Sequence, residues 1–516
     1  MDERVGDELV TEGVLTDPEA GVLVDAAIAE HSASPDLAGR AAGSFVWALA
    51  GVILLQIGSF ATYVIASRYL GPADIGTVGK LLTVVFWVDV LLDLGMGAAL
   101  IYEQEQGQSR RVDIAFTVNS GVAVVVAVVV FLGAPGIADF FSAGSEVTLF
   151  RALAVLILAK GLNQVPDSLL RRNLEFKKRL GCDAVRAGGR FAIATTLLVM
   201  GWGPAAMIVG VIAAEWAAMV LTWILVRFRP RLAFERGIAS DMLRYGLAVF
   251  GSRLVGMLWL NGDYLVVGNR LGGESKAYGE YYTAFRLPEL VLGYGYNIFS
   301  SVAFPTFSAA REVGPEKLRM ASLRMLRLLT LFGFGAGVGM ALVARDFILT
   351  VFGEQFAGAI RPMQLLCIAG AFAGIGFASG DLFNAIGKPK LGLYFNLVGA
   401  PILIIGFLAV VSHGIVWVAA VHLIVIVPYS FFRIGVANRL IGTTWGQSLG
   451  AMRGALCVSL GILALGLPVR LLVGSGFLTG VLIGLAGLLG GFLGLVIGDR
   501  STFSELAELG KKAFGR

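Results

Sequence analysis

Charged residues are scarce in this chain of 516 residues: Asp, Glu, Lys and Arg make up 15% of it, whereas 57% is hydrophobic. Soluble globular domains carry about 25% charged residues, so this composition excludes an ordinary soluble domain. Apolar runs of about twenty residues recur along the chain, each long enough to cross a hydrocarbon core of about 30 Å as a helix. The sequence therefore predicts an all-α, polytopic membrane protein.

Cysteine and histidine are also rare, with three of each. The cysteines lie far apart and form no Cys-x-x-Cys pair, and the histidines do not cluster. This spacing excludes a disulfide framework and a zinc site, so neither a metal nor a cofactor is expected. The residues concerned are Cys182, Cys367, Cys457, His31, His413 and His422.

A nucleotide-binding loop is missing as well. The glycine-rich stretch GFGAGVGMA (333–341) lies inside an apolar run and lacks both the G-x-G-x-x-G spacing and a following Gly-Lys-Ser. Small residues at such a place let membrane helices approach one another closely. We therefore expect no ATP hydrolysis and no enzyme, and we expect energy from an ion gradient, the membrane potential or consumption of a transported lipid.

The chain begins without the basic and hydrophobic regions of a secretory signal peptide, and residues 1–43 are predicted to form an acidic cytoplasmic tail. The net charge of +5 is spread over short loops, which argues against a nucleic-acid partner. Basic residues concentrate in loops such as 171–179 (RRNLEFKKR) and 227–237, and they are rare in alternate loops such as 133–146. This asymmetry places both termini in the cytoplasm.

Fourteen transmembrane helices are expected from the apolar runs. Their predicted ranges are 44–66, 77–101, 112–133, 147–165, 184–201, 205–226, 245–268, 279–304, 322–344, 358–384, 390–411, 414–436, 449–466 and 473–498.

Two turns in the chain are nearly alike: SRYLGPADIG (67–76) and GNRLGGESKAYG (268–279). Further landmarks repeat in the same order at a nearly constant offset, and Asp167 matches Asp381. We interpret the chain as two parallel six-helix repeats, related by an axis along the membrane normal, plus two C-terminal helices. The predicted regions are the tail 1–43, an N-terminal lobe 44–230, a C-terminal lobe 240–440, the appended helices 449–498 and an amphipathic cytoplasmic tail 499–516.

The chain resembles the polysaccharide-exporter (Wzx-type) branch of the multidrug/oligosaccharidyl-lipid/polysaccharide flippase superfamily. The matching text lies within residues 44–445 and includes RYLGPADIG, LLRRNLEFKKRL, NGDYLVVGNRLGGESKAYGEYYTAFRLPEL and LFNAIGKPKLGLYFNLVGAP. The resemblance implies a carrier in the cell membrane that turns lipid-linked saccharides, such as lipopolysaccharide precursors, from the cytoplasmic to the outer leaflet by alternating access. The acidic N-terminal tail departs from the usual pattern of this branch.

Cations within the predicted spans are candidate ligands for the phosphate or diphosphate of such a cargo, because intramembrane charges tend to face a wet cavity or a partner. Arg286 is the first candidate, Arg253 the second and Lys160 the third. A guanidinium group suits phosphate because it donates two hydrogen bonds at once. The alternative for Arg286 is a structural salt bridge with Asp263.

Acidic residues within the spans are candidates for ion coupling or gating: Asp263, Glu289, Asp89, Asp93 and Glu215. Arg286 and Glu289 are three apart, and Asp89 and Asp93 are four apart, so each pair shares a helical face. The alternative for the acids of the first half is ion pairing with Lys160, Arg186 or Arg190.

Two other functions are open to such a sequence. A drug/cation antiporter of the same superfamily would need acidic cavity residues, whereas Arg253 and Arg286 favour an anionic cargo. A membrane-embedded glycosyltransferase or polymerase would need a sizeable outer loop for its catalytic carboxylates, and the predicted outer loops are short. The expected partners of a flippase are the lipid-linked saccharide, the lipid bilayer and a polysaccharide polymerase or glycosyltransferases; a monomer is expected.

Overall fold

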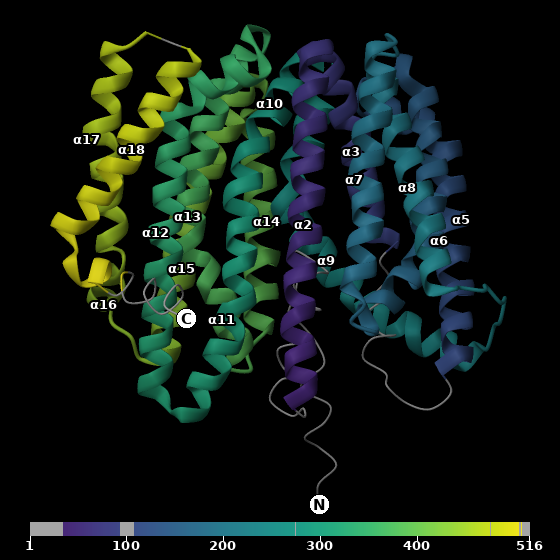
Figure 1. Ribbon diagram of the computed structural model, residues 1–516, viewed down its shortest axis with the longest axis horizontal. Helices are drawn as coiled ribbons and strands as arrows, with labels where there is room; N and C mark the ends of the chain where they lie inside the picture. The colour runs from purple at the N-terminus through teal and green to yellow at the C-terminus, as the bar shows by residue number, and fades with distance from the viewer. Residues whose placement is uncertain (1–34, 93–107, 274, 475, 505–506, 508–516) are drawn as a thin grey trace, which may run out of the picture. The chain divides into compact units, whose positions relative to one another are not determined.

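The computed structural model describes residues 35–92, 108–273, 275–474, 476–504 and 507, and within these ranges the chain forms helices and no strand (Figure 1). Ten of the described helices are long and apolar enough to cross a membrane. The all-α, multi-pass membrane architecture predicted from the apolar runs is thereby confirmed. The described residues fall into two compact units, and the chain passes from one to the other between Tyr282 and Thr283.

The first unit, here the N-terminal unit, contains seven described α-helices, the short η1 (Gly144–Glu146) and the beginning of an eighth α-helix. The α-helices are α2 (Pro35–Tyr69), α3 (Pro72–Leu92), α5 (Gln108–Phe140), α6 (Val147–Arg172), α7 (Phe176–Val199), α8 (Pro204–Val226), α9 (Arg236–Arg270) and the start of α10 (Ser275–Pro288).

The second unit, here the C-terminal unit, contains the rest of α10 and every described element after it. These are η2 (Glu289–Gly293), α11 (Tyr294–Val313), α12 (Pro315–Phe347), η3 (Ile348–Phe352), η4 (Glu354–Ala359), α13 (Ile360–Ala385), α14 (Lys390–Val410), η5 (Val411–His413), α15 (Ile415–Ile441), α16 (Trp445–Ala451), α17 (Arg453–Leu472) and α18 (Phe477–Gly498).

The predicted spans fall on described helices: 77–101 does so on α3 as far as Leu92, and its remainder lies outside the described residues. The span 449–466 falls on α16 and α17, and 279–304 falls on α10, η2 and α11 together. Four of the fourteen are not among the ten apolar helices: α6, α7, α9 and α10–α11. These four carry charged residues inside their predicted spans, which makes them less apolar. That they also cross the membrane, giving fourteen spans, stays a prediction.

A proline interrupts the predicted span 279–304. Pro288 ends the regular α10, and residues Glu289–Gly293 form a π-helical turn before α11 begins. Proline has no backbone N–H and its ring crowds the preceding turn, so it removes one hydrogen bond from the helix. A single π turn of this kind is often found at functional sites, and here it begins at Glu289, three residues after Arg286.

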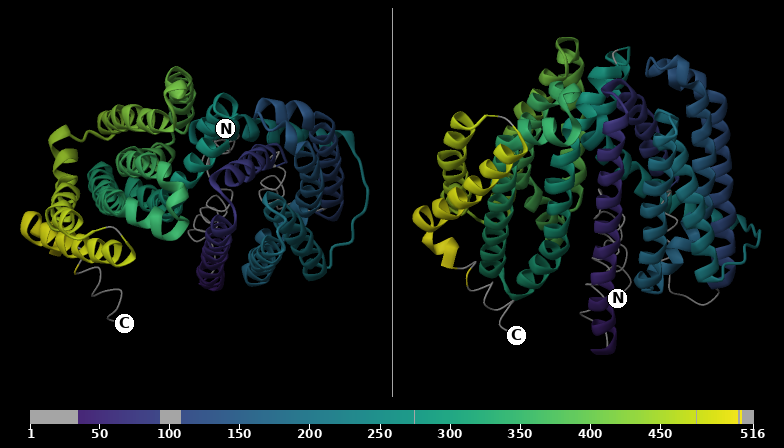
Figure 2. Two further views of the ribbon diagram at one scale, coloured as in Figure 1. Left: turned by 90° about the horizontal axis from the view of Figure 1, so that it is seen from above. Right: turned by 45° about the horizontal axis from the view of Figure 1, so that its top comes forward.

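The same helix pairings recur in the two units. In the N-terminal unit, α6 packs against both α5 and α8, and in the C-terminal unit α13 packs against both α12 and α15 (Figure 2). The N-terminal core includes the stacked rings of Phe141 and Phe150, 6.3 Å apart. Equivalent pairings of the third, fourth and sixth helices are what a duplicated unit would produce. The axis between the repeats and the predicted lobe boundaries stay predictions.

The two similar turns of the sequence contact each other inside the N-terminal unit. Gly76 on α3 and Gly279 on α10 lie where the two backbones come closest. A Cβ atom on Gly76 would overlap the carbonyl oxygen of Ser275, and one on Gly279 would overlap that of Pro72. Only glycine fits at both positions.

A buried lysine fastens the same contact. Lys80, with none of its surface exposed, donates hydrogen bonds from Nζ to the Gly272 carbonyl oxygen at 2.7 Å and to Ser275 Oγ at 2.9 Å. One turn further along α3, Thr83 Oγ1 lies 2.8 Å from Tyr278 Oη. The start of α10 is therefore held on α3 by polar contacts as well as by the glycine pair.

The helices α17 and α18 form a hairpin packed on α12, at the edge of the C-terminal unit (Figure 1). The two helices meet at Gly461 and Gly490, where an added Cβ on either residue would overlap the other's carbonyl oxygen. The hairpin is joined to α12 at one end because Asp346 Oδ1 accepts a hydrogen bond from the Gly476 N–H at 3.0 Å. The two appended helices therefore belong to the C-terminal unit.

Candidate functional site

A network of charged side chains lies within the N-terminal unit. Lys160 on α6 pairs with Asp89 on α3, with 2.6 Å between Nζ and Oδ2. Arg186 on α7 pairs with Asp183 at 2.6 Å and with Glu215 on α8 at 3.0 Å. The ion pairing considered for Asp89 and Glu215 is therefore present, and it joins α3 to α6 and α7 to α8. We call these five residues and Arg190 the charged network.

The spacing of small and charged residues explains how α7 carries most of this network. Asp183, Arg186 and Arg190 follow one another at intervals of three and four, so they share a face of the helix. On α2, Gly51 and Gly58 lie two turns apart. Their positions let α2 lie close to α7: a Cβ on Gly58 would be 2.9 Å from Ala187 Cβ, and one on Gly51 would be 2.8 Å from Asp183 Oδ2.

Arg190 differs from the other cations of the network. Its Nη1 donates to Ser59 Oγ on α2 at 2.9 Å, and its buried Nε has no hydrogen-bond partner. Among the residues that the structure describes, no carboxylate forms an ion pair with it. Glu215 and Asp89 are near enough to interact electrostatically with it. Arg190 is therefore a partly buried guanidinium group held by a hydroxyl, with donors left for another ligand.

The formal charges of the network balance. Three cations (Lys160, Arg186 and Arg190) face three carboxylates (Asp89, Asp183 and Glu215). A set with no net charge avoids much of the cost of burying charge, provided that its members are paired. Because Arg186 holds two carboxylates and Arg190 holds none by direct contact, an anion bound at Arg190 would meet a guanidinium that is not already paired.

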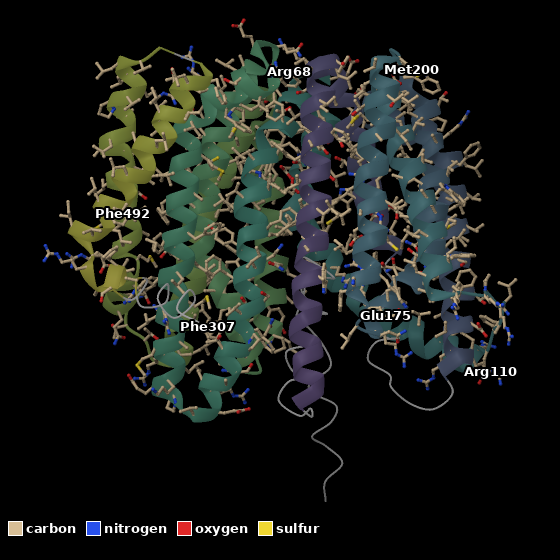
Figure 3. The ribbon with its side chains drawn as sticks, viewed as in Figure 1. Arg68, Arg110, Glu175, Met200, Phe307 and Phe492 are labelled. Carbon is tan, nitrogen blue, oxygen red and sulfur yellow. The ribbon has the colours of Figure 1, made fainter. Side chains whose placement is uncertain are left out.

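A second group of ion pairs fixes the turn between α6 and α7. Asp167 accepts from Arg171 Nη2 at 2.5 Å and from Arg179 Nε at 3.2 Å, and it is largely buried. Figure 3 shows this end of α7 at Glu175 and the opposite end at Met200. Asp167 thus anchors the basic turn 171–179 at the end that the charge asymmetry assigns to the cytoplasm.

Two candidates, Asp263 and Arg253, lie on α9. Asp263 is buried, and its Oδ2 accepts a hydrogen bond from Tyr281 Oη on α10 at 2.7 Å. Tyr264 packs near Tyr281, with ring centroids 6.0 Å apart. Arg253 is half-buried on the same helix. The hydrogen bond between Tyr281 and Asp263 therefore connects α10 to α9.

The candidates Arg286 and Glu289 belong to the C-terminal unit. They were predicted to share a helical face, and they form an ion pair, with Arg286 Nη2 3.1 Å from Glu289 Oε2. The alternative pairing of Arg286 with Asp263 would join residues of different units and stays a prediction. Asp93 lies outside the described residues, so the shared face of Asp89 and Asp93 also stays a prediction.

Several polar residues were missed by the sequence reasoning. Lys80 was not singled out, although a lysine inside an apolar run is itself a signal. Arg190 was considered as a partner for the acids and not as a ligand for the cargo. Asp381 was recognised as the repeat counterpart of Asp167 but not as a functional candidate, and Arg433 was overlooked. Both lie in the C-terminal unit, on α13 and α15.

Comparison with known proteins places the chain in a family. A family model described as polysaccharide biosynthesis protein matches residues 65–361, which is more than half of the chain. The chain belongs to the polysaccharide biosynthesis protein family. The resemblance noted in the sequence is thereby confirmed.

Two relatives of this family member are similar over most of their length. The teichuronic acid biosynthesis protein TuaB of Bacillus subtilis is 27% identical over 69% of this chain and 72% of its own. The lipopolysaccharide biosynthesis protein WzxC of Escherichia coli is 27% identical over 68% of this chain and 70% of its own.

Among solved structures, the chain is similar in fold to the lipid II flippase MurJ in an inward closed conformation. The TM-score is 0.72 at 15% identity, covering 90% of this chain and all of the other. An inward-facing multidrug resistance MATE family transporter matches with a TM-score of 0.58 at 17% identity, over 76% of this chain and 99% of the other. At these identities the likeness establishes a shared fold.

Proposed function

We propose that this protein is a flippase that moves lipid-linked oligosaccharide or polysaccharide precursors from the cytoplasmic to the outer leaflet by alternating access. The observation that carries the proposal is Arg190: a partly buried guanidinium without a paired carboxylate, within the charged network of a polysaccharide biosynthesis family member. The names of TuaB and WzxC support a saccharide pathway, and the fold shared with MurJ supports a carrier.

The phosphate group of the cargo needs a cationic partner while it crosses the membrane. An unpaired anion is expensive in hydrocarbon, and a guanidinium lowers that cost by donating two charge-assisted hydrogen bonds. Arg190 can do so by exchanging the Ser59 hydroxyl for a phosphate oxygen, with no ion pair to break first. Lys160 would have to break its ion pair with Asp89 first, so we propose it as a weaker ligand for the phosphate than Arg190.

The other predicted residues take supporting roles in this proposal. Arg253 and Arg286 stay candidate contacts for the cargo. Asp89, Glu215, Asp263 and Glu289 each accept a hydrogen bond or ion pair that would have to change if the helices moved, which suits a gating role. Asp93 keeps the coupling or gating role proposed from the sequence. A polymerase or glycosyltransferases that supply or use the cargo are the proposed partners of a monomeric carrier.

The orientation proposed for a flippase in the cell membrane has both termini in the cytoplasm. A reporter that is active only outside the cytoplasm should be silent when fused after Arg179, Arg236 or Lys317, and active when inserted at Ser142 or Gly353. The physical reason is that loops rich in Lys and Arg are retained in the cytoplasm. Activity after Arg236 would contradict the topology, because the two repeats would then enter the membrane from opposite sides.

Substitution of Arg190 tests the binding proposal in cells that depend on the protein for surface saccharide. Arg190→Ala should lower export at least about tenfold, since a hydrogen bond to a charged group contributes about 1.5–3 kcal/mol. Arg190→Lys should retain part of the export, because lysine keeps the positive charge but lacks the planar guanidinium that donates two hydrogen bonds to one phosphate. Export is measured as saccharide at the cell surface, normalised to the protein present in the membrane.

The matched control is Arg110→Ala, which removes an arginine that is largely exposed at the start of α5. It should leave export unchanged. Wild-type export by Arg190→Ala at normal membrane level would contradict the assignment of Arg190 as the cargo's ligand.

A further inference from the structure

A carboxylate inside the C-terminal unit has no ion pair among the residues that the structure describes. Asp381 lies on α13, and its Oδ1 accepts a hydrogen bond from Ser300 Oγ on α11 at 2.7 Å. Its other oxygen, Oδ2, is buried and has no hydrogen-bond partner there. A buried acceptor without a partner costs about 1–3 kcal/mol, and more when it is charged. Binding of a ligand to Asp381 Oδ2 would remove this cost, so the buried position of Oδ2 favours such a ligand.

The nearest cation is engaged elsewhere. Arg433 on α15 donates from Nε to Ser379 Oγ at 3.1 Å. Its guanidinium carbon lies over the rings of Phe395 and Tyr429, at 5.4 Å and 5.8 Å from their centroids. The charges of Asp381 and Arg433 interact electrostatically, but they form no ion pair in this conformation. Arg433 therefore has two alternative partners: the aromatic pair with Ser379, or the carboxylate of Asp381.

The repeat counterpart of Asp381 shows what the same position looks like when its charge is neutralised. Asp167, at the matching place on α6, is paired with both Arg171 and Arg179. At Asp381 a hydroxyl takes the place of those two arginines. Asp167 is therefore held in ion pairs. Asp381 keeps a carboxylate oxygen, Oδ2, that can be protonated or ionised.

The chemistry of the site favours a proton over a metal ion. Hard cations such as Ca²⁺ and Mg²⁺ are surrounded by about six oxygen ligands, whereas the recorded contacts of Asp381 offer its carboxylate and one hydroxyl. A proton needs a single oxygen, and Oδ2 supplies it. Binding neutralises the carboxylate, and release restores its attraction for Arg433.

We propose that Asp381 takes up and releases a proton on Oδ2 during the transport cycle, and that Arg433 moves between the aromatic pair and Asp381 in response. With the proton bound, Arg433 stays on Phe395 and Tyr429, where its guanidinium lies in the structure. With the proton released, Arg433 turns to the carboxylate and changes the contact between α13 and α15. The coupling role rests on the proposed transport function, whereas proton exchange at Asp381 does not.

Several charged groups of the neighbouring helices contact other residues of the described chain. On α11, Arg311 donates to the Ala385 carbonyl oxygen. On α12, Arg319 donates to the Ile441 carbonyl oxygen, Asp346 accepts from Gly476, and Arg327 interacts with Asp499. On α14, Phe395 supplies an apolar ring. Within the part of the chain that the structure describes, Ser300 and Arg433 are the groups that interact with the carboxylate of Asp381.

Infrared difference spectroscopy of the full-length protein in lipid vesicles tests the exchange without any substrate. Between acidic and alkaline buffer, the wild type should gain and lose the C=O band of a protonated carboxylic acid in an apolar environment. Asp381→Asn should lack this band. Asp167→Asn is the matched control and should keep it, because Asp167 is held ionised by two arginines. A wild-type band that persists in Asp381→Asn would overturn the proposal.

Two further measurements keep the test decisive. If Asp381→Asn does not fold, Asp381→Glu should retain a titrating band at a shifted frequency, and an unshifted band would contradict the assignment. Sodium added at constant pH should leave the wild-type band unchanged, and loss of the band would show that the ligand is sodium instead.

Coupling to transport is then measured with an imposed pH gradient across the vesicles. Wild-type flipping should respond to the gradient, and Asp381→Asn should flip at a rate that does not depend on it. A gradient response of Asp381→Asn equal to that of the wild type would overturn the coupling role. If the wild type flips no lipid-linked saccharide at all, the proposed function fails, whereas the infrared result still decides whether Asp381 exchanges a proton.

Discussion

Replacing Gly279 with alanine is expected to lower the apparent melting temperature of the purified protein by about 10 °C. The added Cβ would overlap the Pro72 carbonyl oxygen and come within 2.8 Å of the Gly76 nitrogen, and both are backbone atoms that cannot swing aside. Overpacking costs about 1–3 kcal/mol where side chains can adjust, and we expect the upper end or more here. A loss of about 3 kcal/mol shifts melting by roughly 6–12 °C in a domain of this size.

The control for this prediction is Gly121→Ala on α5. A Cβ there meets no atom within 4 Å, and alanine favours a helix by about 1 kcal/mol over glycine. This variant should melt at or above the wild-type temperature. If Gly279→Ala melted with the wild type, α3 and α10 would not be in backbone contact, and the account of the two repeated turns would be wrong.

Replacing Arg186 with leucine is expected to have a comparable effect on stability and to stop transport. Arg186 pairs with the carboxylates of Glu215 and the buried Asp183, and no other cation within the described residues forms an ion pair with Glu215. Removing one partner of a buried ion pair costs about 3–5 kcal/mol, because the remaining charge is left without compensation. Folded protein recovered from membranes in mild detergent, followed by thermal melting, measures the loss.

A second variant distinguishes the stability lost through an uncompensated charge from the stability lost through altered packing. Arg186→Leu combined with Asp183→Asn and Glu215→Gln removes the cation together with both carboxylates. It should recover much of the lost stability, since replacing a whole buried ionic group is often neutral or stabilising. Transport should stay low because the field around Arg190 has changed. Equal melting of the wild type and Arg186→Leu would show that the charged network does not hold α7 to α8.

Much of the fold could be predicted from the sequence because lipid imposes strong rules on it. Apolar runs of the right length become helices, and the described part of each predicted range is helical over most of its length. Few charged residues lie inside those runs, so each has few possible ion-pair partners. The pairs of Asp89 with Lys160 and Glu215 with Arg186 could therefore be predicted as the alternative to a coupling role. The spacing of Arg286 and Glu289 likewise predicted a shared helical face, on which the two form an ion pair.

The rest depends on contacts between residues far apart in the chain. The similarity of the turns 67–76 and 268–279 indicated a duplication, but it could not show that Gly76 and Gly279 touch. The matching of Asp167 and Asp381 indicated equivalent positions, but it could not show that one is paired with arginines and the other with a serine. Those partners come from other helices, whose rotation about their axes is set by packing.

The most direct measurement of the central proposal uses purified protein in vesicles that contain a fluorescent lipid-linked oligosaccharide. A reductant that cannot cross the membrane destroys the label in the outer leaflet. With the wild-type protein, label from the inner leaflet should also become accessible over time, and Arg190→Ala should slow this at least about tenfold. Loss of the outer-leaflet label alone, as in protein-free vesicles, would contradict the proposal that this protein is a flippase.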